Sequence, residues 1–118
     1  MKKPDNQVIV ILGGRGDLAV RKIIPALYAL FRQGLMPERF AVIGTGRNII
    51  TDEAYRQEVL GAVRKETEEN QAGDRDRFAS FFSYVAVDPS APEDYAALSE
   101  ALDRIRTDSG IGGNTLFY

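Results

Sequence analysis

A glycine-rich segment near the N-terminus has the residue types that bind phosphate groups. Residues 13–19 follow the apolar run of residues 8–12 and precede a helical pattern. Glycines at such a turn let backbone N–H groups approach an anion, and the helix behind it presents the positive end of its dipole. Gly13, Gly16 and Ala19 give the pattern G-x-x-G-x-x-A, whose third position must be small for helix and strand to pack. We therefore expect this turn to bind the phosphates of a nucleotide.

Charged residues within and behind the turn have two interpretations each. Arg15 occupies the place of the middle glycine of the full dinucleotide-binding pattern. Asp17 can cap the helix or contact a ligand, and repulsion between its carboxylate and a diphosphate favours capping. Arg21 and Lys22 are either solvated charges or cations near phosphates. A turn that binds no ligand also fits the glycine pattern taken alone.

The end of the second apolar segment indicates which nucleotide the turn binds. A domain that binds NAD has Asp or Glu at this position, where the carboxylate accepts from the ribose 2′-hydroxyl. This chain instead has Gly44-Thr45-Gly46-Arg47-Asn48. The planar guanidinium of Arg47 suits a phosphate, and Asn48 can add a hydrogen bond. The sequence therefore predicts a pocket for a 2′-phosphate, and hence NADP, against the alternative of a surface arginine in a loop.

Alternating strand and helix patterns must position these residues. A proline, Pro25, should kink or break the first helix, which Gly34 should end, and Thr51 should cap the second. The alternation predicts an α/β fold, a Rossmann-like doubly wound parallel sheet. We expect strands at residues 8–12, 40–44, 83–87 and 115–118, helices at 18–33, 52–67 and 93–107, a polar turn at 70–76 and a short helical turn at 78–82.

The predicted sheet has about four strands, fewer than a complete doubly wound domain usually carries. We therefore expect one domain over residues 1–118 that is a fragment of a larger fold. The last strand should be exposed, because no helix follows it to cover it.

The composition excludes several kinds of site. The chain has 118 residues and a net charge of −2, which gives no electrostatic reason to bind nucleic acid or an anionic membrane. It has no cysteine for a thiolate metal site and no histidine for a general base, and its carboxylates form no evident metal cluster. Absence of cysteine fits a cytoplasmic protein. The tyrosines fit packing better than catalysis, and neither Tyr55 nor Tyr95 has the lysine four residues on that short-chain reductases require.

Taken together, these motifs resemble the N-terminal part of the glucose-6-phosphate dehydrogenase family. The family oxidises glucose 6-phosphate at C1 with NADP to 6-phosphogluconolactone, in the oxidative pentose phosphate pathway. It has an N-terminal coenzyme domain and a larger β+α domain. The resemblance covers nearly the whole chain and is carried by residues 13–22, 24–28, 34–37, 42–47, 52–53, 81–84 and 113–118.

The resemblance implies roles for individual residues. The turn would bind the coenzyme diphosphate mainly through its backbone. Arg47 and Asn48 match the residues of the family that contact the 2′-phosphate. Asp88, after the third strand, lies where the family lines the adenosine side of the coenzyme site. Lys22 matches the lysine that reaches both the sugar phosphate of the substrate and the coenzyme. The cofactor-binding set is therefore Gly13, Gly14, Arg15, Gly16, Asp17, Leu18, Arg47, Asn48 and Asp88.

No catalytic residue lies in this chain according to the resemblance, because the histidine base of the family lies beyond its end. The chain alone should be inactive, and the complete enzyme should be a homo-oligomer. Two positions depart from the family: Arg15 replaces a Ser or Thr, and Val20 replaces a common lysine. An alternative function is therefore a non-catalytic, self-associating domain that binds no nucleotide because Arg15 blocks the turn.

Overall fold

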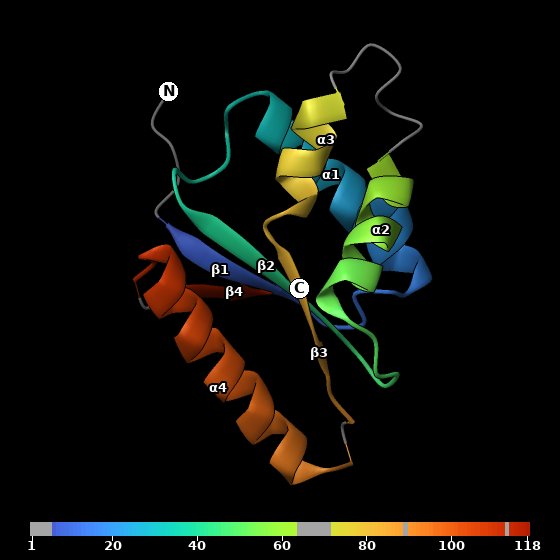
Figure 1. Cartoon of the computed structure of the whole chain (residues 1–118), viewed down its shortest axis with the longest axis vertical. Coiled ribbons are helices and arrows are strands. Elements are labelled where there is room, and N and C mark those ends of the chain that lie inside the picture. The colour runs from blue at the N-terminus through green and yellow to red at the C-terminus, as the bar shows by residue number, and fades with distance from the viewer. Residues whose placement is uncertain (1–5, 64–71, 89, 113) are drawn as a thin grey trace.

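A four-stranded parallel sheet forms the centre of the molecule (Figure 1). The computed structural model of the chain describes residues 6–63, 72–88, 90–112 and 114–118. The strands pair in the order β3-β2-β1-β4, and every neighbouring pair is parallel. This confirms the predicted Rossmann-like α/β fold. The strand bounds are β1 (Gln7–Ile11), β2 (Phe40–Gly46), β3 (Phe82–Ala86) and β4 (Thr115–Phe117).

Helices cover both faces of this sheet (Figure 1). One face carries the π-helix η1 (Ala19–Ile23), α1 (Ile24–Arg32), α2 (Asp52–Val63) and α3 (Ala72–Ala79), and the other carries α4 (Pro92–Ser109). Alternate strand residues point to opposite faces. Ile9 and Val42 accordingly join the apolar cluster under the first group of helices, whereas Val8 and Ile43 join the cluster under α4. The sheet is therefore buried on both sides, as its near-continuous apolar strands require.

The first helix changes type immediately before Pro25. The N–H of Ile24 donates to the carbonyl of Ala19, a bond that spans five residues and belongs to the π-helix, and α1 follows with Pro25 in its first turn. Helix precedes Pro25 directly, so its missing N–H removes a donor from the ladder at the junction of η1 and α1. The predicted break thus takes the form of a change from π to α geometry. Gly34, with a φ of 70°, follows the end of α1 as expected.

Several predicted segment boundaries need correction. The second strand continues to Gly46 instead of ending at residue 44, and the last helix spans Pro92–Ser109 instead of residues 93–107. Residues 70–76 were expected to be a polar turn, yet α3 begins at Ala72. The helical turn expected at residues 78–82 is the end of this helix, which stops at Ala79. Asp74, Arg75 and Asp76 are at least partly exposed, while Phe78 and Ala79 are buried and fix the helix on the core. The strand at Phe82 consequently starts one residue earlier than predicted. The predicted end of the second helix, residues 64–67, lies outside the described residues.

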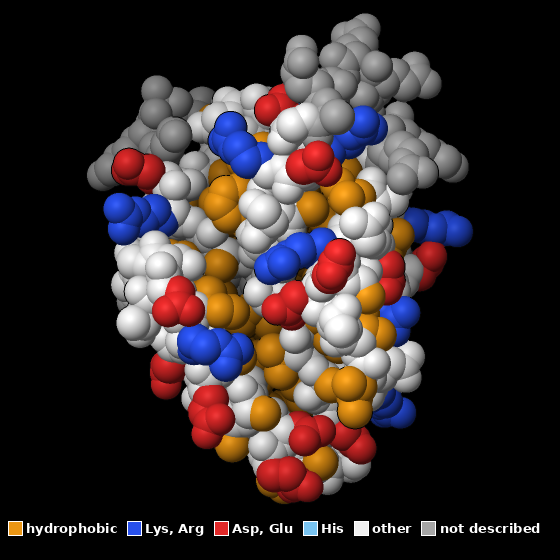
Figure 2. Space-filling model, in the orientation of Figure 1, with side chains coloured by type: hydrophobic (Ala, Val, Ile, Leu, Met, Phe, Trp, Pro, Cys, Tyr) orange, Lys and Arg blue, Asp and Glu red, His pale blue; other side chains and the backbone are white. Residues whose placement is uncertain are grey.

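One face of the molecule has an apolar strip and an acidic end. Figure 2 shows hydrophobic side chains along the middle of one face and acidic side chains gathered at its lower end, where α4 begins. Glu93 and Asp94 lie in the first turn of α4, where negative charge is favoured by the helix dipole.

Leu116 and Phe117 of the edge strand β4 are exposed, as predicted for the last strand. Within the described ranges, no helix is long and apolar enough to cross a membrane.

Phe78 should be one of the residues on which stability depends most. Phe78→Ala is expected to lower the free energy of unfolding by about 3–5 kcal/mol, because it removes a fully buried ring and leaves a cavity. That ring packs edge-on against Tyr28 and Phe82, at 5.0 Å in each case. Equilibrium unfolding in urea measures the change. Phe117→Ala is the matched control, because its ring is 55% exposed, and it should cost less than about 1 kcal/mol. Equal losses in both variants would contradict this assignment of the core.

Candidate functional site

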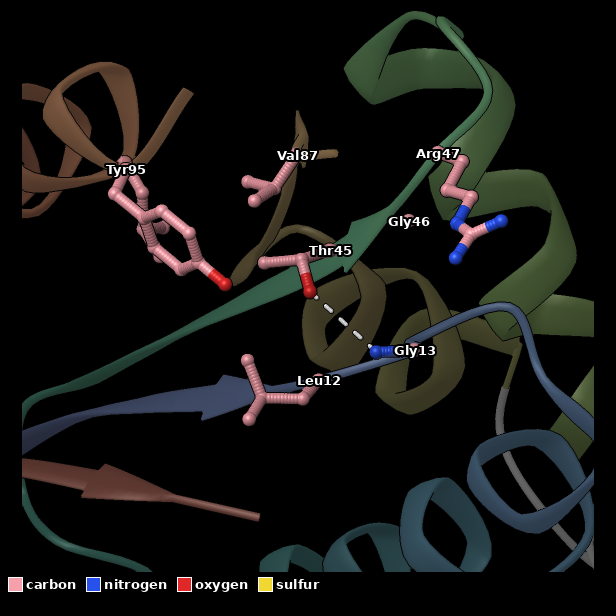
Figure 3. A pocket seen from close by; sticks show the side chains of 8 residues that line it. Leu12, Gly13, Thr45, Gly46, Arg47, Val87 and Tyr95 are labelled. Carbon is pink, nitrogen blue, oxygen red and sulfur yellow. Dashed lines mark hydrogen bonds between the residues drawn. The ribbon is translucent and has the colours of Figure 1, made fainter. Parts of the chain in front are cut away.

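The glycine turn is bound to the end of the neighbouring strand. Ile11 lies opposite Gly44 in the parallel ladder, so the segments that follow β1 and β2 leave the sheet side by side. The N–H of Gly14 donates to the carbonyl of Thr45 at 2.7 Å, and the N–H of Gly13 donates to its hydroxyl at 3.4 Å (Figure 3). Gly13 has a φ of 67°, in the left-handed region that favours glycine. The turn therefore has a defined position relative to β2.

These bonds determine which backbone donors remain for an anion. The N–H of Gly16 closes the turn on the carbonyl of Gly13 at 2.9 Å, so three of the glycine N–H groups donate within the protein. Among the described residues, the N–H groups of Arg15, Asp17 and Leu18 find no acceptor. They lie at the N-terminal end of the helical segment, where the dipole favours negative charge. The turn can thus bind an anion through these three donors.

The Arg15 side chain is directed toward α2. Its Nε donates to both carboxylate oxygens of Glu58, at 3.0 and 3.1 Å. About a third of each side chain is exposed, 32% for Arg15 and 37% for Glu58. The hydrogen bond and charge of Glu58 raise the pKa of the Arg15 guanidinium, which remains charged. Sequence reasoning missed Glu58, because nothing in the pattern of the second helix distinguishes it from a solvated carboxylate.

Asp17 does not cap the helix, contrary to the sequence-based prediction. Its carboxylate accepts from Nε of Arg21 at 2.9 Å, and both side chains are largely exposed. Leu18 occupies the N-cap position of η1 in a helical conformation, with no side-chain hydrogen bond to the helix end. Opposite charges four residues apart on a helical surface attract each other, which explains the observed pair. Lys22 is exposed on η1 and is not among the residues that line the pocket described next.

A pocket opens beside the turn at the carboxyl ends of the strands, with a volume of about 340 Å³ (Figure 3). Its walls are mostly apolar, and Arg47 supplies the positive charge. Tyr95 was predicted from the sequence to pack in the core or to be partly buried. It projects instead from α4 into this pocket and is half exposed. An apolar pocket with one cation suits a flat heterocycle that carries an anionic group. The lining residues are Leu12, Gly13, Thr45, Gly46, Arg47, Val87, Tyr95 and Leu98.

The two remaining predicted residues lie near this pocket but do not line it. Asn48 follows Arg47 in the exposed loop, and its carbonyl accepts from the Tyr84 hydroxyl at 2.7 Å. Asp88 follows β3, where its carboxylate accepts from the N–H and the hydroxyl of Ser90 at 2.9 and 2.7 Å. Those two bonds, followed by the charge of Arg47, lower the pKa of Asp88. In the part of the chain that the structure describes, no cluster of three metal-binding side chains occurs.

Comparison with known proteins identifies the origin of this arrangement. A family model described as "Glucose-6-phosphate dehydrogenase, NAD binding domain" matches residues 10–118. This chain belongs to the glucose-6-phosphate dehydrogenase family. It comprises a coenzyme-binding domain of that family, in agreement with the resemblance found in the sequence.

Several glucose-6-phosphate 1-dehydrogenases are similar to this chain over most of its length. The enzyme from Leuconostoc mesenteroides is 32% identical over 111 residues, which are 94% of this chain and 22% of that protein. The enzyme from Aggregatibacter actinomycetemcomitans is 37% identical over 117 residues, 98% of this chain and 23% of that protein. The chain thus spans about a fifth of the length of these glucose-6-phosphate dehydrogenases.

Solved glucose-6-phosphate dehydrogenase structures share the fold. One, described as a complex with its substrate glucose-6-phosphate, superposes with a TM-score of 0.86 at 28% identity, covering 100% of this chain and 25% of the other. The enzyme from Mycobacterium avium gives a TM-score of 0.76 at 28% identity, covering 99% and 24%. The arrangement of sheet and helices is therefore that of the N-terminal region of this family.

The Asp88 carboxyl should titrate below its usual pKa of 3.8. A lowered pKa means that the associated stability is present above about pH 4 and is lost as the pH falls through the lowered value. Ser90→Ala should raise the pKa toward 3.8, because it removes the hydroxyl donor and keeps the backbone donor. Carbon-detected NMR titration measures both values.

Ser80→Ala is the control for the Asp88 titration, because the Ser80 hydroxyl donates to the carbonyl of Arg77 and leaves the contacts of Asp88 intact. An Asp88 pKa that is the same in wild type and Ser90→Ala would contradict the observed hydrogen bond.

Proposed function

We propose that this chain is the NADP-binding domain of a glucose-6-phosphate dehydrogenase. The observation that carries the proposal is the position of Arg47, whose cation borders the pocket beside the glycine turn at a strand end that has no carboxylate. A 2′-phosphate would bring two or more charged oxygens to this guanidinium, whereas the 2′-hydroxyl of NAD would find no carboxylate acceptor there. The residues at the end of β2 thus favour the phosphorylated coenzyme.

The described residues give each part of the coenzyme a matching chemical environment. The apolar pocket under Tyr95 suits the adenine ring, and Arg47 with Asn48 suits the 2′-phosphate. The three free N–H groups at Arg15, Asp17 and Leu18 suit the diphosphate. When bound, NADP would supply the hydride acceptor of the reaction. The work of this domain is to hold that coenzyme in one orientation.

The reaction itself requires residues outside this chain. In the proposed reaction, glucose 6-phosphate gives up the hydride of C1 to the coenzyme and the proton of the C1 hydroxyl to a base, and becomes 6-phosphogluconolactone. The chain has no histidine to accept that proton, so it should be inactive alone. Lys22, exposed on η1, is the cation of this domain proposed to contact the sugar phosphate. We place the complete protein in the cytoplasm, as a homo-oligomer in the oxidative pentose phosphate pathway.

The conformation of Arg15 disfavours the alternative of a domain that binds no nucleotide. That alternative requires the guanidinium to fill the space in front of the turn. Both hydrogen bonds of its Nε run instead to Glu58 on α2, so the side chain lies to one side. The exposed apolar residues of β4, Leu116 and Phe117, remain the feature in favour of self-association.

Arg47 should determine the preference between the two coenzymes. Wild type is expected to bind NADP more tightly than NAD in isothermal titration calorimetry. Arg47→Gln should weaken NADP binding by about 10- to 100-fold, because a charge-assisted phosphate contact is lost, and should change NAD binding less than about twofold. The charge-matched control is Arg104→Gln on the exposed surface of α4, which should bind both coenzymes like wild type. Equal wild-type affinities would contradict the role of Arg47, and binding of neither would support the alternative.

Glu58 should weaken the affinity of the turn for phosphate. Glu58→Gln removes a negative charge beside the proposed diphosphate site and leaves Arg15 free to turn toward it. We expect NADP to bind about three- to fivefold more tightly, an effect that should diminish with added salt. Glu100→Gln, an exposed carboxylate on α4, is the control and should leave the affinity unchanged. Weaker binding by Glu58→Gln would show that the ion pair instead stabilises the turn.

A further inference from the structure

Two tyrosine hydroxyls lie beneath the two loops that border the proposed coenzyme site. The Tyr55 hydroxyl of α2 donates to the carbonyl of Gly14 in the glycine turn at 2.9 Å, in a buried bond. The Tyr84 hydroxyl of β3 donates to the carbonyl of Asn48, next to Arg47, at 2.7 Å. Each loop is therefore attached by its backbone to a side chain from a different element.

Glycines provide the space for both tyrosines. A Cβ on Gly44 would overlap the ring and hydroxyl of Tyr55, and a Cβ on Gly46 would lie 2.5 Å from the Tyr84 hydroxyl. Gly14 is restricted in the same way, because its Cβ would lie 2.6 Å from the Tyr55 hydroxyl. The glycines at the end of β2 thus admit tyrosine side chains, in addition to any part they play in coenzyme approach.

The two tyrosines also contact each other and are fixed by other bonds. Their rings pack with centroids 5.3 Å apart and an angle of 49° between planes. The Tyr84 N–H donates to the Asp52 carboxylate at 2.9 Å, which connects β3 to the start of α2. Burial raises the pKa of both hydroxyls above the usual value near 10, so both remain protonated donors at neutral pH. Fixed rings with protonated hydroxyls can hold their acceptor carbonyls in place.

We propose that Tyr55 and Tyr84 are positioning residues that hold the glycine turn and the Arg47–Asn48 loop at a fixed separation, so that one coenzyme molecule contacts both. The inference rests on the proposed function, because it concerns how that coenzyme is bound. Tyr55 positions the diphosphate donors through Gly14. Tyr84 positions the 2′-phosphate contact through Asn48. Tyr84 also lies beside the Arg15 guanidinium of the glycine turn, so we expect its effect on the turn to be weaker than that of Tyr55 but present.

Phenylalanine variants test the proposal, because they keep the rings and remove only the hydroxyls. Tyr55→Phe should weaken NADP and NAD binding equally, by about tenfold, because both coenzymes carry the diphosphate. Tyr84→Phe should weaken NADP binding by a similar factor and NAD binding by a smaller one, because NAD lacks the 2′-phosphate but still contacts the turn beside Arg15. Tyr28→Phe, which removes a hydroxyl from the same apolar cluster, should change neither affinity. Calorimetry measures the affinities, and thermal unfolding checks that each variant folds.

Hydrogen exchange in the chain without coenzyme provides a second measurement that does not depend on binding. Peptides covering residues 12–17 should exchange faster in Tyr55→Phe, and peptides covering residues 46–50 should exchange faster in Tyr84→Phe, each relative to Tyr28→Phe. Unchanged exchange of both loops would overturn the positioning role, whatever the affinities. If the loops exchange faster in the two variants but the wild-type chain binds neither coenzyme, the positioning role is retained and the proposed function is rejected. Weakened affinity without altered exchange would assign the hydroxyls to direct ligand contacts and overturn the proposal.

Discussion

The attachment of the glycine turn to Thr45 is the interaction on which the arrangement of the site depends. A parallel sheet brings the ends of β1 and β2 to the same edge, but it does not specify how the segments beyond them run. Two bonds to one residue, from the N–H groups of Gly13 and Gly14, set that path. They use the N–H groups of Gly13 and Gly14, so an anion could bind only to donors further along the turn. Thr45 is itself buried, so the acceptor cannot easily move.

The local features of the site were predictable from sequence, because short-range chemistry determines them. The glycine spacing after an apolar strand, the absence of a carboxylate at the next strand end, and the Thr51 cap, which accepts from the Ala54 N–H at 3.0 Å, each involve neighbouring residues. The alternating pattern likewise predicted the parallel sheet and its helices. The error at Asp17 arose because capping and an ion pair four residues on are both local options for one carboxylate, and their energies are similar.

Contacts across long sequence separations could not be predicted in this way. Glu58 meets Arg15 across 43 positions, and Tyr55 meets Gly14 across 41. No residue type in the second helix indicates which of its carboxylates or aromatic rings faces the turn, because that depends on the angle at which α2 packs on the sheet. The same limit explains Tyr95, whose helical spacing fits a buried stripe although the side chain lines a pocket. Tertiary packing, which periodicity does not encode, decides each of these cases.

The shared volume of Gly44 and Tyr55 has a consequence for how this sequence can vary. A methyl group at position 44 and an aromatic ring at position 55 exclude each other, so the two positions should change together among related sequences. Position 46 and Tyr84 are linked by the same steric rule. Redesign of the strand end toward another coenzyme is therefore free at position 47, whose side chain is exposed, but is constrained at positions 44 and 46 by rings from two other elements. A carboxylate grafted at either glycine would need a smaller partner in place of its tyrosine.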